Sequence, residues 1–170
     1  NLVVTNCEFN NIANEENQNY AALHLNVADG VLENLTFTNN KVNGITGGES
    51  AALYGNFTGD VTITGNVIRS TSGSSMVVGY SNATIIITDN ILENWALSGK
   101  GRAIRLDVNN EANASTVVVS DNAMIHANAP EEFVKSTGSN TTVTLNENYW
   151  HGKSPREEGM VTAAGVVIDN

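Results

Sequence analysis

Thr64-Gly65-Asn66 recurs in related forms along the chain, and this repeat determines the expected fold. The segment follows a short apolar run, Val61-Thr62-Ile63, and precedes a second one, Val67-Ile68. Related segments with the same kind of neighbours are Thr38-Asn39-Asn40, Thr88-Asp89-Asn90, Ser120-Asp121-Asn122 and Asn146-Glu147-Asn148. Their last asparagines lie 24 to 32 residues apart, and a repeat of this length is typical of a solenoid.

Two properties of asparagine explain why it recurs at this turn. Asparagine tolerates the left-handed backbone conformation that a sharp bend between two strands requires. In a stack of such turns, each side-chain amide can also donate to the amide oxygen of the next. We therefore predict an asparagine ladder at one corner, the alternative being that asparagine is only a common turn residue. Cys7 occupies this place in the first repeat, and we expect it to pack as a small buried group.

Each repeat contains a third short apolar segment besides the two that flank the turn. We call these the first, second and third strands, in chain order. The third strands are expected near residues 21–25, 51–54, 76–78, 103–106, 133–135 and 161–168. Variable loops rich in Gly, Ser and Asn follow the second and third strands, and the two-residue hairpins of an antiparallel meander are scarce. The pattern predicts an all-β, right-handed parallel β-helix of about six coils, with three short strands per coil.

Length and charge limit the choice of function. The 170 residues suit one domain, which we expect to span 1–170 and to be excised from a longer multidomain protein with flanking coils or domains. The formal charge of −10 argues against nucleic acid and anionic membranes as partners. No apolar run approaches the ~18 residues of a membrane span. Neutral or cationic ligands, carbohydrates among them, are compatible with this charge.

Alternation along the third strands separates expected inner from outer side chains. The predicted inner positions are Leu23, Leu53, Val77, Ile104 and Phe133, and those of the first strands are Phe37, Ile63, Ile87, Val119 and Leu145. The predicted outer positions are His24, Tyr54, Val78, Arg105 and Val134, beside Asn26, Asn56, Tyr80, Asp107 and Ser136. This outer surface is where we expect a binding site.

Arg105 and Asp107 are the weak catalytic candidates, since Lys100 and Arg102 precede them and form a basic cluster in an acidic chain. The alternative is a surface ion pair of little energetic consequence. The residues expected to bind a ligand are His24, Tyr54, Tyr80, Arg105, Asp107 and Trp150. Trp150 is a candidate sugar-stacking platform, and its alternative role is in a hydrophobic cap near the last coil.

Metal chemistry has little support in the sequence. Asp89, Asp121 and Glu147 are expected to stack on the outer corner of the ladder turns, as solvated turn residues. The alternative there is a calcium site, which would need further oxygen ligands. His24, His126 and His151 lack the spacing of a zinc site. We expect no cofactor and no bound metal.

These features resemble the pectin-lyase-like superfamily of right-handed β-helices, in particular the repeat-rich domains of large secreted or surface-anchored bacterial proteins. The resemblance is carried by the Thr-x-Asn turns, by Cys7-Glu8-Phe9-Asn10-Asn11-Ile12 and by Asn148-Tyr149-Trp150-His151-Gly152 followed by Pro155. It implies the fold and an extracellular, carbohydrate-facing setting. The acid clusters, paired aspartates and Gly-His-Gly of the superfamily's enzymes do not appear in the sequence.

We therefore expect a non-catalytic module of a secreted or cell-surface bacterial protein, structural or adhesive, with carbohydrate or another cell-surface ligand as its partner. The alternative is a fragment of a polysaccharide lyase or glycoside hydrolase that acts on acidic or on host or plant polysaccharide, with Arg105 in its groove. One scaffold of this kind hosts both classes, so the fold does not choose between them.

Overall fold

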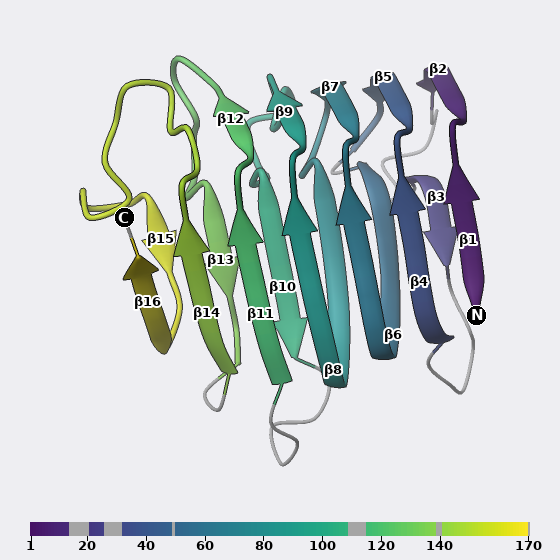
Figure 1. Ribbon diagram of the computed structural model, residues 1–170. Coiled ribbons are helices and arrows are strands. Elements are labelled where there is room, and N and C mark those ends of the chain that lie inside the picture. Colours follow the sequence, from purple (N-terminus) through teal and green to yellow (C-terminus); the bar gives the residue numbers. More distant parts are fainter. Residues whose placement is uncertain (14–20, 26–31, 49, 109–114, 139–140, 170) are drawn as a thin grey trace.

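The computed structural model describes residues 1–13, 21–25, 32–48, 50–108, 115–138 and 141–169. Every regular element that it describes is a β-strand, and every described strand pairing is parallel. In Figure 1 the chain rises along the front sheet, crosses to the rear at the top, descends there, and starts its next coil farther to the left. The winding is therefore right-handed, and the predicted parallel β-helix is confirmed.

The first face consists of the first strands, those that precede the ladder turns. They are β1 (Leu2–Thr5), β4 (Leu32–Thr38), the second halves of β6 (Ala51–Thr64) and β8 (Met76–Thr88), β11 (Ser115–Ser120), β14 (Thr141–Asn146) and β16 (Gly165–Asp169). Side chains alternate between the interior and solvent along these strands. The inward positions predicted from the sequence are confirmed, because each is at most 2% exposed: Phe37, Ile63, Ile87, Val119 and Leu145.

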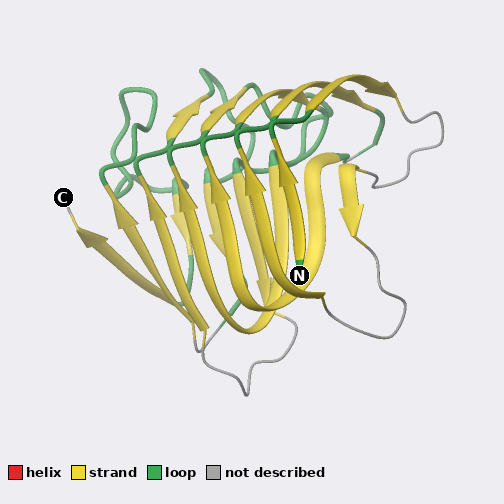
Figure 2. Ribbon diagram, turned by 45° about the vertical axis from the view of Figure 1, so that its right-hand side comes forward, coloured by secondary structure: helices red, strands yellow, loops and turns green. Residues whose placement is uncertain are grey.

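Two further faces complete each coil around the apolar interior (Figure 2). The second face contains β2 (Glu8–Ala13), β5 (Lys41–Thr46), β7 (Val67–Thr71), β9 (Ile91–Glu93) and β12 (Ala123–Ile125). The third face contains β3 (Ala21–Leu25), the first halves of β6 and β8, β10 (Ile104–Val108), β13 (Val134–Ser136) and β15 (Val161–Thr162). The three short strands per coil predicted from the sequence correspond to these three faces.

In two coils the third strand continues directly into the next first strand, where the sequence predicted a loop. β6 and β8 are single long strands that bend from the third face to the first. The bend in β6 contains Gly59 at φ +81°, where an added Cβ would lie 2.5 Å from Oδ1 of Asn34. That oxygen accepts a hydrogen bond from the backbone N–H of Asp60 at 2.7 Å. A glycine and an asparagine of the neighbouring coil therefore shape this corner.

The predicted asparagine ladder is confirmed at the corner between the first and second faces. In the first four ladder asparagines, Nδ2 donates to Oδ1 of the next one along the chain, at 2.9 to 3.1 Å. The same oxygens accept the backbone N–H of the preceding coil at 2.9 to 3.0 Å. Nδ2 also donates to a main-chain carbonyl of the coil before, for example from Asn90 to Ile63 at 2.9 Å. The members of the ladder are Asn40, Asn66, Asn90, Asn122 and Asn148.

The left-handed residue of each turn is the one before the ladder asparagine. Positive φ angles occur at Asn39, Gly65, Asp89, Asp121 and Glu147. The ladder asparagines are not among the residues with positive φ. Backbone tolerance therefore explains the residue that precedes each ladder position, and hydrogen bonding alone explains the asparagine.

Cys7 occupies the ladder position of the first coil, but its side chain is exposed, so the prediction that it is buried is wrong. Its backbone N–H donates to Oδ1 of Asn40 at 3.0 Å, as the ladder register requires. Its thiol lies 3.4 Å from the carbonyl of Thr5. Among the described strands β1 pairs only with β4.

We predict that Asn90→Ala lowers the free energy of unfolding by about 3 kcal/mol, because it removes several hydrogen bonds at a buried corner and takes from the backbone N–H of Asn66 its acceptor. The groups that each lose one hydrogen bond are the backbone N–H and Nδ2 of Asn66, the carbonyl of Ile63 and Oδ1 of Asn122. Urea unfolding followed by circular dichroism measures the change. The matched control is Asn43→Ala at an exposed position of β5, and an equal loss in both variants would contradict the prediction.

Candidate functional site

The outer side of the third face presents one column of side chains across successive coils. In register order the column contains His24, Tyr54, Val77, Arg105, Lys135 and Thr162. His24 and Tyr54 are in ring contact, with centroids 4.9 Å apart and an edge-on arrangement. The predicted outer positions His24, Tyr54 and Arg105 therefore do lie in one column.

Two coils are displaced by one residue from the register that the sequence predicted. Val77 is on the outer side and Val78 is fully buried, and Lys135 is on the outer side while Val134 is buried. The predictions for Val77, Val78 and Val134 were therefore wrong. The cause is the uniform apolar character of residues 76–78 and 133–134, since a run without alternation does not define which side faces inward.

Tyr80 does not belong to this outer surface. It is fully buried next to Phe57 in the register, and its hydroxyl lies 3.3 Å from Oγ of Ser136. The prediction that Tyr80 and Ser136 face outward was wrong because of the same one-residue shift in register. Asn26, which was also expected here, lies outside the described residues.

A hollow of about 260 Å³ lies beside the column and collects side chains from several coils. Its lining residues are Ala51, Tyr54, Ser74, Val77, Lys100, Gly101, Arg102, Arg105 and Glu131. Tyr54 and Arg105 come from β6 and β10, whereas Lys100 and Arg102 come from the loop before β10. The structure therefore brings the predicted aromatic residue and the predicted basic cluster to one concavity. Asp107 does not line the hollow, although it contacts Arg105.

Arg102 forms the fixed part of this site. Its side chain is 11% exposed, its Nη1 lies 3.1 Å from Oε2 of Glu131, and its Nε lies 2.8 Å from Oε2 of Glu132. Its backbone N–H donates to Oγ of Ser74 at 3.0 Å. Two carboxylates thus neutralise this guanidinium, which ties the loop before β10 to the coils on either side.

Gly101 allows the loop to approach its neighbour closely. Its φ is +133°, and an added Cβ would lie 2.5 Å from the carbonyl carbon of Gly73 in the preceding coil. Its N–H donates to Oε2 of Glu131 at 2.7 Å. Neither Gly101 nor Glu131 was predicted from the sequence, because the close approach of two loops depends on tertiary packing. The only indication was a glycine on each side of Lys100.

Arg105 is the more accessible arginine of the hollow. Its side chain is 41% exposed, and its Nε donates to Asp107 at 3.0 Å. This is the surface ion pair that the sequence left open as the alternative role. An arginine in such a pair still presents its planar guanidinium edge for hydrogen bonds to a ligand.

Burial raises the pKa of Glu132, but hydrogen bonds from its own backbone, from Arg102 and from Thr162, together with the charge of Arg102, outweigh that effect. The pKa of Glu132 therefore lies below its ordinary value of 4.5. A carboxyl whose pKa is lowered by folding stabilises the fold above that ordinary value, and this stabilisation is lost as the pH falls through the lowered pKa.

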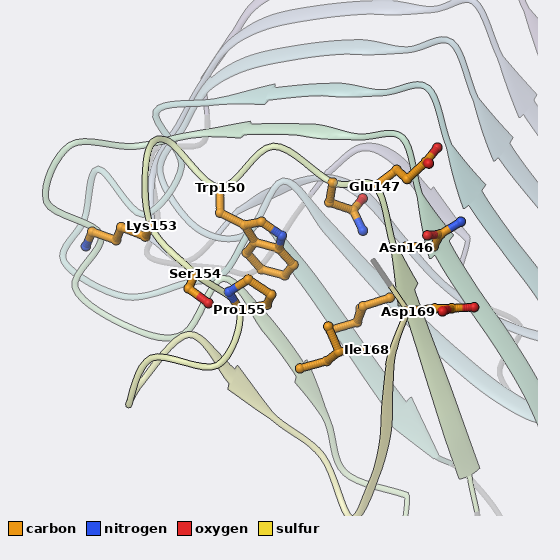
Figure 3. A pocket seen from close by; sticks show the side chains of 10 residues that line it. Asn146, Glu147, Trp150, Lys153, Ser154, Pro155, Ile168 and Asp169 are labelled. Carbon is orange, nitrogen blue, oxygen red and sulfur yellow. The ribbon is translucent and has the colours of Figure 1, made fainter.

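Trp150 lies apart from this site, near the C-terminal end of the described solenoid (Figure 3). It is 5% exposed, and its ring packs against Phe133 with centroids 6.1 Å apart. It lines a different hollow of about 410 Å³, together with Pro155 and Ile168. The structure does not bring it together with Tyr54 and Arg105.

Asp89, Asp121 and Glu147 lie on the exposed outer corner of the ladder turns, as expected. Within the described ranges, no group of three or more His, Cys, Asp or Glu side chains has an arrangement that could hold a metal ion. In the same part of the chain, no helix is long and apolar enough to cross a membrane.

Comparisons of the chain with protein-family models, with curated proteins and with solved structures gave no match.

We predict that Arg102→Ala lowers the free energy of unfolding by about 1 to 3 kcal/mol at neutral pH, because it leaves two partly buried carboxylates without their cation. The difference from the unmodified chain should shrink as the pH falls below about 4.5 and Glu132 becomes protonated. Urea unfolding at several pH values measures this.

The matched control is Arg69→Ala, whose partner is Glu93 and whose side chain is 49% exposed. We expect this control to change stability by no more than about 0.5 kcal/mol. A pH-independent difference for Arg102→Ala would contradict the assignment of the effect to Glu132.

Proposed function

We propose that the chain is a non-catalytic β-helix module of a secreted or cell-surface protein, and that it binds polysaccharide at the hollow on the third face. In this proposal it is a divergent member of the pectin-lyase-like superfamily. The strands of the coils provide a rigid support for the main ligand contacts, and the loops between them complete the hollow.

The observation that carries the proposal is that Tyr54 and the half-exposed Arg105 line one concavity of about 260 Å³. Sugar rings pack their C–H faces on aromatic side chains, and their hydroxyl and carboxylate groups accept hydrogen bonds from a guanidinium. Both side chains stand on strands, and a site built on rigid elements loses little entropy when a ligand binds.

The column around the hollow offers further contacts to an extended ligand. Tyr54 has His24 as its neighbour on one side, and Arg105 has Lys135 as its register partner on the other. A polymer chain that runs along the solenoid axis would meet these side chains in order. The basic residues favour a sugar unit that carries a carboxylate or another anionic group.

The state of the nearby carboxylates supports binding rather than catalysis. Glu131 accepts hydrogen bonds from Gly101 and Arg102, and Asp107 is paired with Arg105. Glycoside hydrolysis uses two carboxylates on either side of the scissile bond, whereas Glu131 is the only carboxylate among the residues that line the hollow. The alternative of a lyase or hydrolase fragment is therefore less well supported, and the test below includes it.

We predict that Tyr54→Ala and Arg105→Ala each weaken polysaccharide binding at least about tenfold, because each removes one of the two main contacts. A glycan array identifies the ligand, and calorimetry measures its affinity. Binding of an anionic ligand should also weaken with added salt, less steeply in Arg105→Ala. Arg69→Ala, on the second face, is the matched control.

Depolymerisation of the bound polysaccharide, lost in Arg105→Ala, would overturn the non-catalytic proposal and favour the enzyme fragment. Binding that is unchanged in both hollow variants would move the site elsewhere. Failure to bind any glycan on the array would leave the chain as a structural spacer.

A further inference from the structure

The first face turns a regular array of small side chains toward solvent, independently of the hollow on the third face. Its strands lie side by side in Figure 1. The central outward column is Val3, Thr36, Thr62, Ile86, Val118, Thr144 and Val167. The column next to the ladder is Thr5, Thr38, Thr64, Thr88, Ser120, Asn146 and Asp169. A shorter third column is Asp60, Thr84, Thr116, Thr142 and Gly165.

Threonine fills 10 of the 19 positions in these columns, and in the central column three threonines stand among four Val or Ile side chains. These β-branched side chains are held in place before any partner arrives. A β-branched side chain on a strand has few accessible rotamers, so little side-chain entropy is lost on binding. Hydroxyls of neighbouring coils also contact each other, from Thr38 to Thr5 at 3.1 Å and from Ser120 to Thr88 at 3.2 Å. The face therefore offers hydroxyl and methyl groups at fixed positions.

The array is almost free of charge, although the chain carries a formal charge of −10. Among the outward residues of the three columns, only Asp60 and Asp169 are charged, and both lie at the margin of the array. No aromatic side chain is present in these columns either. Such a face matches an uncharged, regular surface better than a charged protein or a polyanion.

The spacing of the array, which parallel β-sheets share, adds a second criterion. Neighbouring strands repeat at ~4.8 Å along the solenoid axis, and outward residues repeat at ~6.6 Å along each strand. Hexagonal ice presents its oxygen atoms at similar repeats along two perpendicular directions. Water held at an ordered position costs little when the surface already fixes its partners. We propose that the first face binds ice, through threonine hydroxyls and methyl groups that order water in the ice repeat.

The test uses the whole 170-residue chain and ice itself as the probe. Nanolitre osmometry measures the gap between the melting and freezing temperatures and records the shape of the growing crystal. We expect faceted crystals and a measurable gap for the unmodified chain. We expect loss of both in Thr62→Lys, because a lysine in the central column displaces the ordered water.

The matched control is Thr46→Lys, the same change at an exposed position of β5 on the second face. It should keep the activity, and circular dichroism should show that both variants remain folded. Round crystals with the unmodified chain, or equal activity in both variants, would overturn the proposal. So would a dimer in sedimentation that Thr62→Lys abolishes, or binding to crystalline cellulose without any effect on ice. These two results would assign the face to a second copy of the chain or to a crystalline polysaccharide.

Discussion

The asparagine ladder is the interaction on which the rest of the structure depends. Each amide group satisfies polar groups of the coils on both sides, at a corner where the backbone leaves one strand and enters the next. Because the ladder fixes that corner in five successive coils, the loops elsewhere differ in length without disturbing the stacking. The distance along the chain between ladder partners ranges from 24 to 32 residues, yet the hydrogen bonds differ by no more than 0.2 Å.

The fold and the ladder were predictable from the sequence, because a turn that recurs in phase with alternating apolar runs is compatible with few architectures besides a solenoid. The register of the third face was not. Val77, Val78 and Val134 stand in runs without polar neighbours, and a shift of one residue reverses which of them faces inward. The burial of Tyr80 follows from the same shift. Tyr54 and His24 were placed correctly because polar or small neighbours mark the alternation there.

The candidate site was only half predictable for a different reason. The sequence could indicate that Arg105 follows Lys100 and Arg102 in an acidic chain, but it could not show which arginine is neutralised. That distinction depends on Glu131 and Glu132, which lie about 30 residues away in the sequence and meet Arg102 only because coils stack. The loops before β10 and β13 carry the arginine and the two glutamates of this ion-pair network, whereas the outward side chains of the first face carry almost no charge.

The parallel stacking also determines how the molecule would respond to mechanical tension. The hydrogen bonds between coils, those of the ladder included, run along the solenoid axis, so a force between its two ends pulls directly on them. Coils would detach one after another from an end, since each contacts only its neighbours. Each step would release one coil of ~26 residues, which extends by about 90 Å. A module of this kind would lengthen stepwise under load and absorb energy at every coil.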